Sequence, residues 1–152
     1  LAKKSKKELS QFRLHNLGFV FQAYNLIPVL TAAENIEFSL MLLGINEKER
    51  RNKVLSLLQE LNIKEFADKR PNQMSGGQQQ RVAVARAIIH NPCIVLADEP
   101  TANLDSKTSG ELMDLMARLN KEKNITFVFS SHDKLVIERA RKLILLKDGI
   151  IE

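Results

Sequence analysis

The chain has 152 residues, which is enough for one domain with a buried core and short for two independent domains. Hydrophobic residues make up 44% and charged residues 27%, a balance that excludes a disordered or fibrous protein. No apolar stretch approaches the roughly 20 residues that span a bilayer.

The net charge of +5 is concentrated near the start of the chain, in Lys3, Lys4, Lys6 and Lys7. No aromatic residue is interleaved with these lysines, so a solvated helix end explains them better than a nucleic-acid or lipid patch. The one cysteine, Cys93, lies in an apolar run. It predicts a core position and a reducing, cytosolic compartment.

A helix and a strand are predicted at the beginning of the chain. Ser5 and Glu8 have the spacing of a capping box, which predicts a helix to about residue 13. Residues 17–22 have the β-branched and aromatic character of a strand. Gln22 is therefore expected at the end of a strand.

The middle of the chain is predicted to be helical. Thr31 and Glu34 form a second capping box, before a helix to about residue 43. A further helix follows Asn46, with apolar residues at i, i+3, i+4 and i+7. Pro71 interrupts this pattern, and another helix is predicted over 76–90.

The last third alternates apolar runs with amphipathic segments. Strands are predicted at 93–97, 125–129 and 143–146, with helices over 106–121 and 134–141. The dipeptide Asp148-Gly149 is typical of a type I′ hairpin turn. Alternating helices and fully apolar strands predict an α/β fold whose mainly parallel sheet is covered on both faces, with the helical middle as an insertion.

Polar residues follow three of the predicted strands. Asp98 and Glu99 end an apolar strand, where an α/β sheet opens onto a ligand crevice. In phosphoryl transfer such an aspartate helps to hold Mg²⁺, and an adjacent carboxylate can orient and polarise water. His132 and Gln22 are expected at the same edge of the sheet. The alternative is a set of surface and capping residues without chemistry.

A predicted helix N-terminus contains two glycines, in the run Ser75, Gly76, Gly77, Gln78. Glycine costs up to about 1 kcal/mol relative to alanine in a helix, so the pair indicates that something approaches the backbone closely. Phosphate is a candidate, because a helix N-terminus offers free N–H groups and the positive end of the dipole. A flexible turn before a helix is the alternative.

Together these features resemble the ATP-binding cassette (ABC) ATPase family over essentially the whole chain. Residues 75–81 resemble the family signature, 94–99 its Walker B strand and 102–105 its D-loop. His132 and Gln22 fall where the family has its switch histidine and Q-loop glutamine. The run 97–108 looks closest to the lipoprotein-release and macrolide-export branch.

The chain departs from the family pattern in three ways. Met74 stands where leucine is usual, and Ala102 where glycine or serine is common. The larger departure is that no G-x-x-x-x-G-K-[ST] occurs, although this motif cradles the phosphates. The resemblance implies a P-loop NTPase-like domain truncated at its N-terminus, which lacks ATPase activity on its own. Within this partial domain, 1–152, residues 31–92 would form the helical subdomain and 93–152 the Walker B, D-loop and H-loop part.

The resemblance implies a Mg²⁺-dependent ATPase in which two cassettes sandwich ATP. The cofactors would be ATP and Mg²⁺, and Ser75 to Gln78 would face the nucleotide of the second cassette. Asp98 would hold Mg²⁺ through water, Glu99 would act as general base and His132 would contact the γ-phosphate. Gln22 would link metal and attacking water to the transport partner, and Asp105 would signal across the interface.

The same resemblance implies an ATP-binding transporter subunit. Its helical subdomain would dock on membrane permease subunits, which predicts a cytoplasmic protein held at the inner face of the membrane. No nucleic acid is expected as a partner. Two alternatives remain: a cassette ATPase that acts on DNA or ribosomes, and a catalytically inactive dimerisation or regulatory module. The transported substrate is not specified by these residues.

Overall fold

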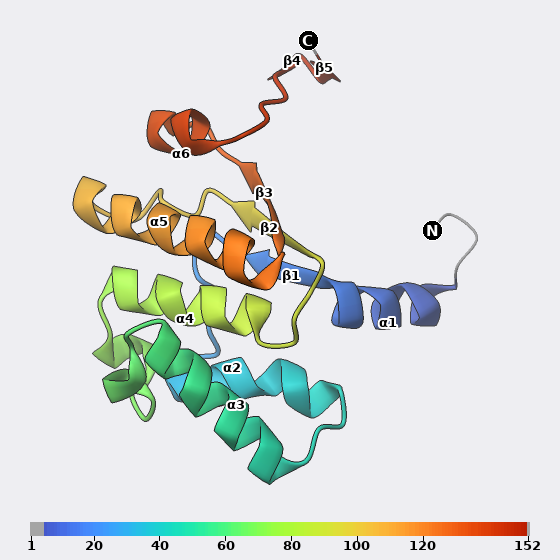
Figure 1. Cartoon of the computed structure of the whole chain (residues 1–152), viewed down its shortest axis with the longest axis vertical. Helices are drawn as coiled ribbons and strands as arrows, with labels where there is room; N and C mark the ends of the chain where they lie inside the picture. Colours follow the sequence, from blue (N-terminus) through green and yellow to red (C-terminus); the bar gives the residue numbers. More distant parts are fainter. Residues whose placement is uncertain (1–4, 152) are drawn as a thin grey trace.

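A three-stranded parallel sheet forms the centre of the computed structural model, which describes residues 5–151 (Figure 1). The strands β1 (Leu17–Val20), β2 (Ile94–Asp98) and β3 (Thr126–Ser130) lie in the order β1-β2-β3. β2 is hydrogen-bonded to a neighbour on each side.

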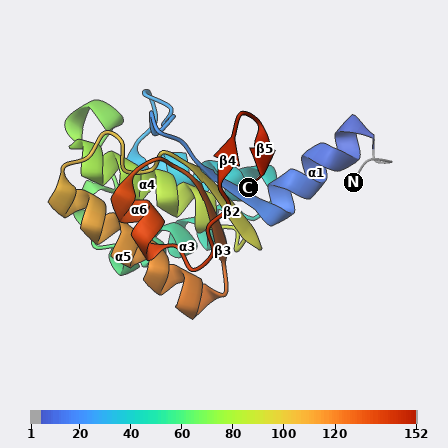
Figure 2. The same ribbon diagram turned by 90° about the horizontal axis from the view of Figure 1, so that it is seen from above.

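Within residues 5–151, six α-helices surround this sheet or extend from it. They are α1 (Lys6–Asn16), α2 (Ala32–Leu42), α3 (Glu47–Glu60), α4 (Gly76–Ile88), α5 (Ser106–Lys123) and α6 (Lys134–Arg139), with 3₁₀ turns at Lys64–Phe66 and Pro71–Gln73. In Figure 1, α4 and α5 lie beside the sheet, and α2 and α3 lie beyond α4. Figure 2 shows α1 extending away from the body of the molecule. None of the helices between residues 5 and 151 has the length and apolar character needed to cross a bilayer.

Side-chain caps start the helices where the sequence predicts. Glu8 accepts a hydrogen bond from the Ser5 backbone N–H at 2.8 Å, and Glu34 accepts one from the Thr31 N–H at 2.7 Å. The hydroxyls of these caps bond the backbone in return, so both capping boxes are confirmed. Asn46 caps α3 as predicted. These caps are local, which explains why the sequence reveals them.

The C-terminal end of the chain is a short antiparallel hairpin of β4 (Leu146–Lys147) and β5 (Ile150–Ile151). Asp148 and Gly149 have φ angles of +51° and +81°, which confirms the predicted turn. The strand is shorter than the predicted 143–146 and begins only at Leu146. Figure 1 shows this hairpin projecting from the body of the molecule.

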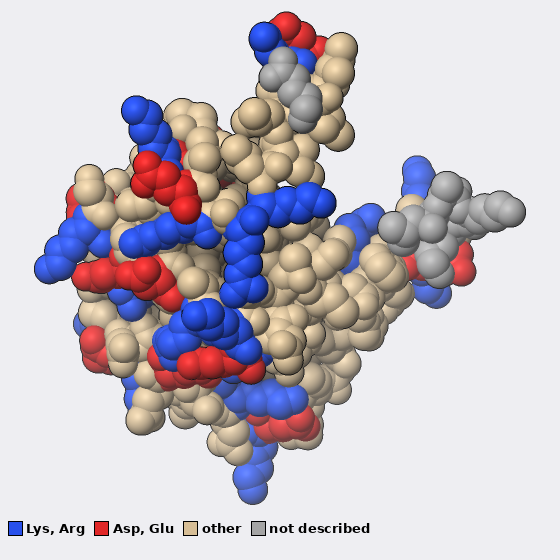
Figure 3. Space-filling model, turned by 45° about the horizontal axis from the view of Figure 1, so that its top comes forward, with Lys and Arg blue, Asp and Glu red and all other residues tan. Residues whose placement is uncertain are grey.

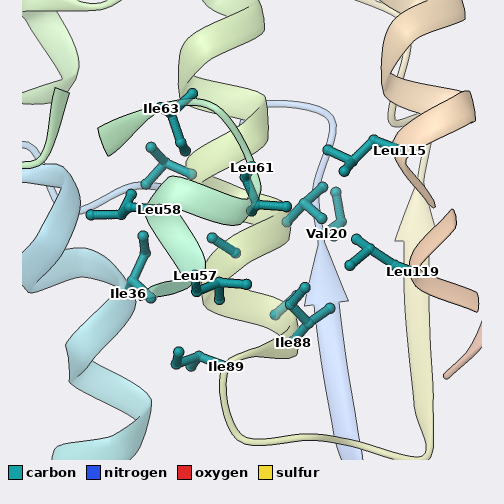
Figure 4. Close-up of a cluster of buried hydrophobic side chains, with 14 of the residues drawn as sticks. Val20, Ile36, Leu57, Leu58, Leu61, Ile63, Ile88, Ile89, Leu115 and Leu119 are labelled. Atoms are coloured by element: carbon teal, nitrogen blue, oxygen red, sulfur yellow. The ribbon is translucent and has the colours of Figure 1, made fainter. Parts of the chain in front are cut away.

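One hydrophobic core joins the helical middle to the sheet (Figure 4). Leu58 of α3, Ile88 of α4, Leu119 of α5 and Val20 of β1 belong to it, each at most 1% exposed. Ile36 of α2 is equally buried. The helical middle and the sheet therefore share one packed interior, which fixes α4 relative to the strands.

The sheet is covered on one face, whereas the sequence predicted cover on both. Val95 and Ala97 are at most 1% exposed, and they belong to the core that α4 and α5 complete. Leu96 and Val128 point to the opposite face and remain 37% and 49% exposed. A continuous apolar run does not reveal which of its two sides is covered, because apolar residues also occur on exposed surfaces.

Cys93 precedes the central strand β2. Cys93 is exposed, so its predicted core position is wrong. Its backbone is paired, since its N–H donates to the Asn16 carbonyl and its carbonyl accepts from Thr126, but it precedes β2 and its side chain lies outside the core. Of the lysine cluster, Lys3 and Lys4 lie outside the described residues.

Candidate functional site

Asp98 and Glu99 lie at the carboxyl end of the central strand. Asp98 is paired in register with Ser130, so the polar ends of β2 and β3 are adjacent. The Asp98 side chain is exposed, and among residues 5–151 it takes part in no hydrogen bond or ion pair. Glu99 turns the chain away from the strand with a φ of +41°, and its N–H donates to the Ser130 carbonyl at 2.9 Å.

The Glu99 carboxylate is held by the segment that follows β3. Its Oε2 accepts a hydrogen bond from the Ser131 hydroxyl at 2.7 Å. Its Oε1 accepts from the His132 backbone N–H at 3.2 Å and lies 2.6 Å from His132 Nδ1. Because an ionised carboxylate can only accept, Nδ1 bears the proton in this contact. The predicted meeting of Glu99 and His132 at one edge of the sheet is present in the geometry.

This arrangement determines the protonation of Glu99. Burial by itself would raise the pKa of the Glu99 carboxyl, but the hydrogen bonds from Ser131 and His132 outweigh that effect and hold the pKa below its ordinary value. Glu99 is therefore ionised at neutral pH. Three hydrogen bonds occupy its two oxygens, which leaves room for a further donor such as water. The His132 side chain is 91% exposed, so its Nε2 is accessible to a ligand.

A second layer of hydrogen bonds ties the loop after β2 to the loop after β3. The Thr101 hydroxyl donates to Asp133 Oδ2 at 2.7 Å, and the Asp133 N–H donates to Ser131 Oγ at 3.1 Å. The bond from Thr101 is the main reason that the pKa of Asp133 is lowered. Sequence reasoning missed Thr101, Ser131 and Asp133. The sequence offered one indication of their role, which is that each lies within two residues of Glu99 or His132.

A hollow of about 390 Å³ opens beside this network. Glu99, His132 and Asp133 line one part of it, and Leu104 and Ser106 line another. Its volume lies in the range of sites that bind small molecules. A polar group placed there would meet the Glu99 and His132 side chains.

The predicted anion site at the start of α4 has its own internal bonds. The Gln78 N–H donates to Ser75 Oγ at 3.4 Å, and the Ser75 N–H donates to Gln78 Oε1 at 2.8 Å. This confirms the capping box. No hydrogen bond among residues 5–151 joins Ser75 or Gln78 to Glu99 or His132, so the sheet edge and the start of α4 are two separate groups.

The two glycines of α4 lie against side chains from other parts of the chain. A Cβ at Gly76 would lie 2.7 Å from the Tyr24 hydroxyl, and one at Gly77 would lie 2.6 Å from Cγ2 of Thr108. The close approach predicted from the glycine pair is present, but these protein side chains make it. The glycines are therefore explained without phosphate and are not independent evidence for it.

Gln22 and Asp105 lie near the start of α4. Gln22 is exposed just after β1, and its carbonyl accepts a hydrogen bond from Asn103 Nδ2 at 2.9 Å. Asp105 caps α5, with its two oxygens bonded to the Thr108 hydroxyl at 2.6 Å and the Thr108 N–H at 2.9 Å. These bonds lower the pKa of Asp105. Asp105 thus has a structural role in this conformation.

The described residues do not form a complete metal site. Between residues 5 and 151 no group of three or more His, Cys, Asp or Glu side chains is arranged to hold a metal ion. Mg²⁺, however, is usually held by one or two carboxylates together with waters and substrate phosphates. The unpaired carboxylate of Asp98 and the amide oxygen of Gln22 are suitable donors of this kind, so the residues fit Mg²⁺ in the presence of a phosphate ligand.

Comparison with known proteins gives consistent matches. A family model described as "ABC transporter" matches residues 2–102. The ABC transporter ATP-binding protein YtrE of Bacillus subtilis (strain 168) is 47% identical over 148 residues, which are 97% of this chain and 64% of YtrE. The lipoprotein-releasing system ATP-binding protein LolD of Legionella pneumophila (strain Lens) is 42% identical over 145 residues, which are 95% of this chain and 64% of LolD.

A solved structure agrees with these matches. The dimeric post-hydrolysis structure of the ATP-binding cassette MJ0796 of Methanocaldococcus jannaschii, bound to ADP and Pi, has a TM-score of 0.87 to this chain at 45% identity. The similarity covers 99% of this chain and 66% of that one. The chain thus spans slightly less than two thirds of the length of these relatives.

Proposed function

Because the chain belongs to the ABC transporter family, we propose that it is the nucleotide-hydrolysing part of a transporter's ATP-binding subunit. ATP hydrolysis in a head-to-tail pair of cassettes would drive transport through membrane permease partners. The observation that supports this most directly is the pair formed by Glu99 and His132 beside the free carboxylate of Asp98. The family relationship supplies the rest, since the relatives are ATP-binding proteins of transport systems.

In this proposal Glu99 takes a proton from the attacking water. Its lowered pKa keeps it ionised, and Ser131 and His132 fix the direction of its oxygens. The exposed Nε2 of His132 would donate to the terminal phosphate, which requires the imidazolium form because the Nδ1–H is already directed at Glu99. Asp98 and Gln22 would hold Mg²⁺, which supplies positive charge against the phosphate oxygens.

The remaining predicted residues would act between two cassettes. Ser75, Gly76, Gly77 and Gln78 would face the nucleotide of the second copy, and Asp105 would lie at the interface. Ser75 is exposed at the N-terminus of α4. A helix N-terminus favours anions, which supports a contact between Ser75 and the phosphates of the second copy's nucleotide. The 152 residues contain no G-x-x-x-x-G-K-[ST] motif, so the proposed site needs a phosphate-binding loop from outside this sequence.

The helical part, about residues 31–92, is proposed to dock on the permease from the cytoplasmic side of the membrane. Three apolar residues on α2 support this, because they remain 39% to 56% exposed: Phe38, Met41 and Leu42. A nucleic-acid partner is not proposed. On the face in Figure 3, basic and acidic side chains lie intermixed, whereas a nucleic-acid footprint is a basic patch or stripe.

ATP turnover tests the proposal. We would join the N-terminus of this chain to a segment from a cassette relative that contains a G-x-x-x-x-G-K-[ST] loop, and measure Mg²⁺-dependent hydrolysis of this chimera. Glu99→Gln should lower kcat by about a hundredfold or more while ATP still closes the dimer, because only the base is lost. Ser75→Arg should prevent dimer closure.

The control is Glu122→Gln, an exposed carboxyl of α5, which should leave turnover unchanged. The chain without the added segment should show no turnover. Normal hydrolysis by the Glu99→Gln chimera would remove Glu99 from the role of base. Hydrolysis by the chain alone, abolished by Glu99→Gln, would show that an added phosphate-binding loop is not required.

A further inference from the structure

The loop that follows β1 has an unusual backbone. Tyr24 and Asn25 have φ angles of +61° and +48°, in the left-handed region. Asparagine tolerates this region, but a bulky residue such as tyrosine is rarely found there. Two consecutive residues in this conformation persist only where the surroundings hold them. The loop that contains Gln22 is therefore fixed by contacts with other parts of the chain.

Arg86 of α4 makes the most specific of these contacts. Its Nη2 donates to the Tyr24 carbonyl at 2.8 Å, and its Nη1 donates to the Asn25 carbonyl. A guanidinium offers two parallel donors in a rigid plane, which matches two neighbouring carbonyls held in a fixed orientation. Burial lowers the pKa of Arg86, but arginine remains a cation at neutral pH, so both bonds have a charged donor.

Two more contacts attach the loop to the rest of the site. Asn103 Nδ2 donates to the Gln22 carbonyl, and the Tyr24 hydroxyl lies against Gly76 at the start of α4. Gly76 and Arg86 are ten residues apart, about 15 Å along a helix. The loop is therefore in contact with both ends of α4.

From these contacts we infer that Arg86 and Asn103 are positioning residues for Gln22. They hold the loop 22–25 against α4, so that the loop and the Ser75 end of that helix move as one unit. A displacement of Gln22 is then transmitted to the signature residues through the Arg86 and Tyr24 contacts. The consequence for catalysis rests on the proposed function of Gln22, but the mechanical link does not.

A spectroscopic test is available because Tyr24 is the one tyrosine and the chain has no tryptophan. Tyrosine fluorescence of the 152-residue chain therefore reports on this loop alone. In Arg86→Gln, acrylamide quenching of Tyr24 should rise about twofold, and hydrogen exchange at the Tyr24 and Asn25 amides should accelerate about tenfold. The phenol pKa, which burial raises, should move toward its ordinary value.

Arg81→Gln is the matched control. Arg81 is on the same helix but bonds Glu111 and the Leu61 carbonyl instead of the loop, so the Tyr24 signals should not change. Asn103→Ala removes an exposed side chain and should loosen the loop even if Arg86→Gln fails to fold. Arg86→Lys keeps the charge without the planar pair of donors and should give an intermediate signal.

Unchanged Tyr24 quenching and exchange in both Arg86→Gln and Asn103→Ala would overturn the inference. Equal changes in Arg81→Gln and Arg86→Gln would also overturn it, since any substitution of an arginine on α4 would then loosen the loop. These measurements need no nucleotide. If the variants of the 152-residue chain show the expected Tyr24 changes and the chimera does not hydrolyse ATP, only the proposed function is refuted. If the chimera is active and the Tyr24 signals are unchanged in both variants, only the inference is refuted.

Discussion

The two faces of the central sheet contain similar side chains and differ in what covers them. Val95 and Ala97 are buried in the core that α4 and α5 complete, while Leu96 and Val128 come from the same strands and remain partly exposed. Burial here depends on the neighbouring layer and not on residue type. An apolar strand can therefore be buried on either face, and the packing of helices determines which face is buried.

A matched pair of leucine substitutions should give the largest difference between the two faces. Leu119→Ala, on the helix that covers the sheet, should lower the free energy of unfolding by about 2–5 kcal/mol, because it leaves a cavity. Leu96→Ala, on the open face, should cost less than about 1 kcal/mol. Urea unfolding of both variants measures this, and equal losses would mean that the open face is covered in solution.

The open face should also make the chain associate. Leu96 and Val128 are exposed, and among the residues that the structure describes no strand pairs with the outer edge of β1 or of β3. Such surfaces favour pairing with another chain. Light scattering should detect dimers or larger species, and Leu96→Glu combined with Val128→Glu should reduce them. A monodisperse wild-type monomer with a cooperative melt above about 65 °C would contradict this expectation.

The smallest expected difference in the free energy of unfolding is between substitutions of the two acids at the end of β2. Glu99→Gln weakens the bonds from Ser131 and His132 and should cost about 1 kcal/mol at pH 7, whereas Asp98→Asn removes no hydrogen bond and should be near neutral. The folded-state pKa of Glu99 is lowered. Its contribution is therefore complete above the ordinary carboxyl pKa of about 4.3 and is lost as pH falls through the lowered value.

Thermal melts of both variants and the wild type from pH 7 to pH 3 check this sign. The gap between wild type and Glu99→Gln should close in acid, while Asp98→Asn should follow the wild type throughout. A gap that widens as the pH falls would show that burial of Glu99, and not its hydrogen bonding, dominates.

The sequence predicted features that arise within a few residues of one another. The caps at Ser5, Thr31 and Ser75 and the turn at Asp148 are each formed by neighbouring side chains and backbone, so their spacing is visible in the sequence. The meeting of Glu99 with the segment after β3 joins residues 32 and 33 positions apart and was predictable for a different reason, because the carboxyl ends of parallel strands lie at one edge of a sheet.

Other features that depend on distant parts of the chain could not be predicted. The exposure of Cys93 follows from where β2 begins and what packs beside it. The glycines of α4 indicated a close neighbour, but only the folded chain shows that Tyr24 and Thr108 are that neighbour. Nothing in the sequence indicated the contacts of Arg86, since its partners are backbone carbonyls about sixty residues earlier in the chain.

Glu99 combines its chemistry with a left-handed backbone, at a φ of +41°. Glycine or asparagine would occupy that position with less conformational strain, although neither could replace a glutamate as a base. If sequences were ranked by fold stability alone, the residue at 99 would be among the first to be exchanged. Stabilisation programmes that choose substitutions by backbone preference should therefore leave this position fixed, because the gain in stability would come at the expense of the proposed reaction.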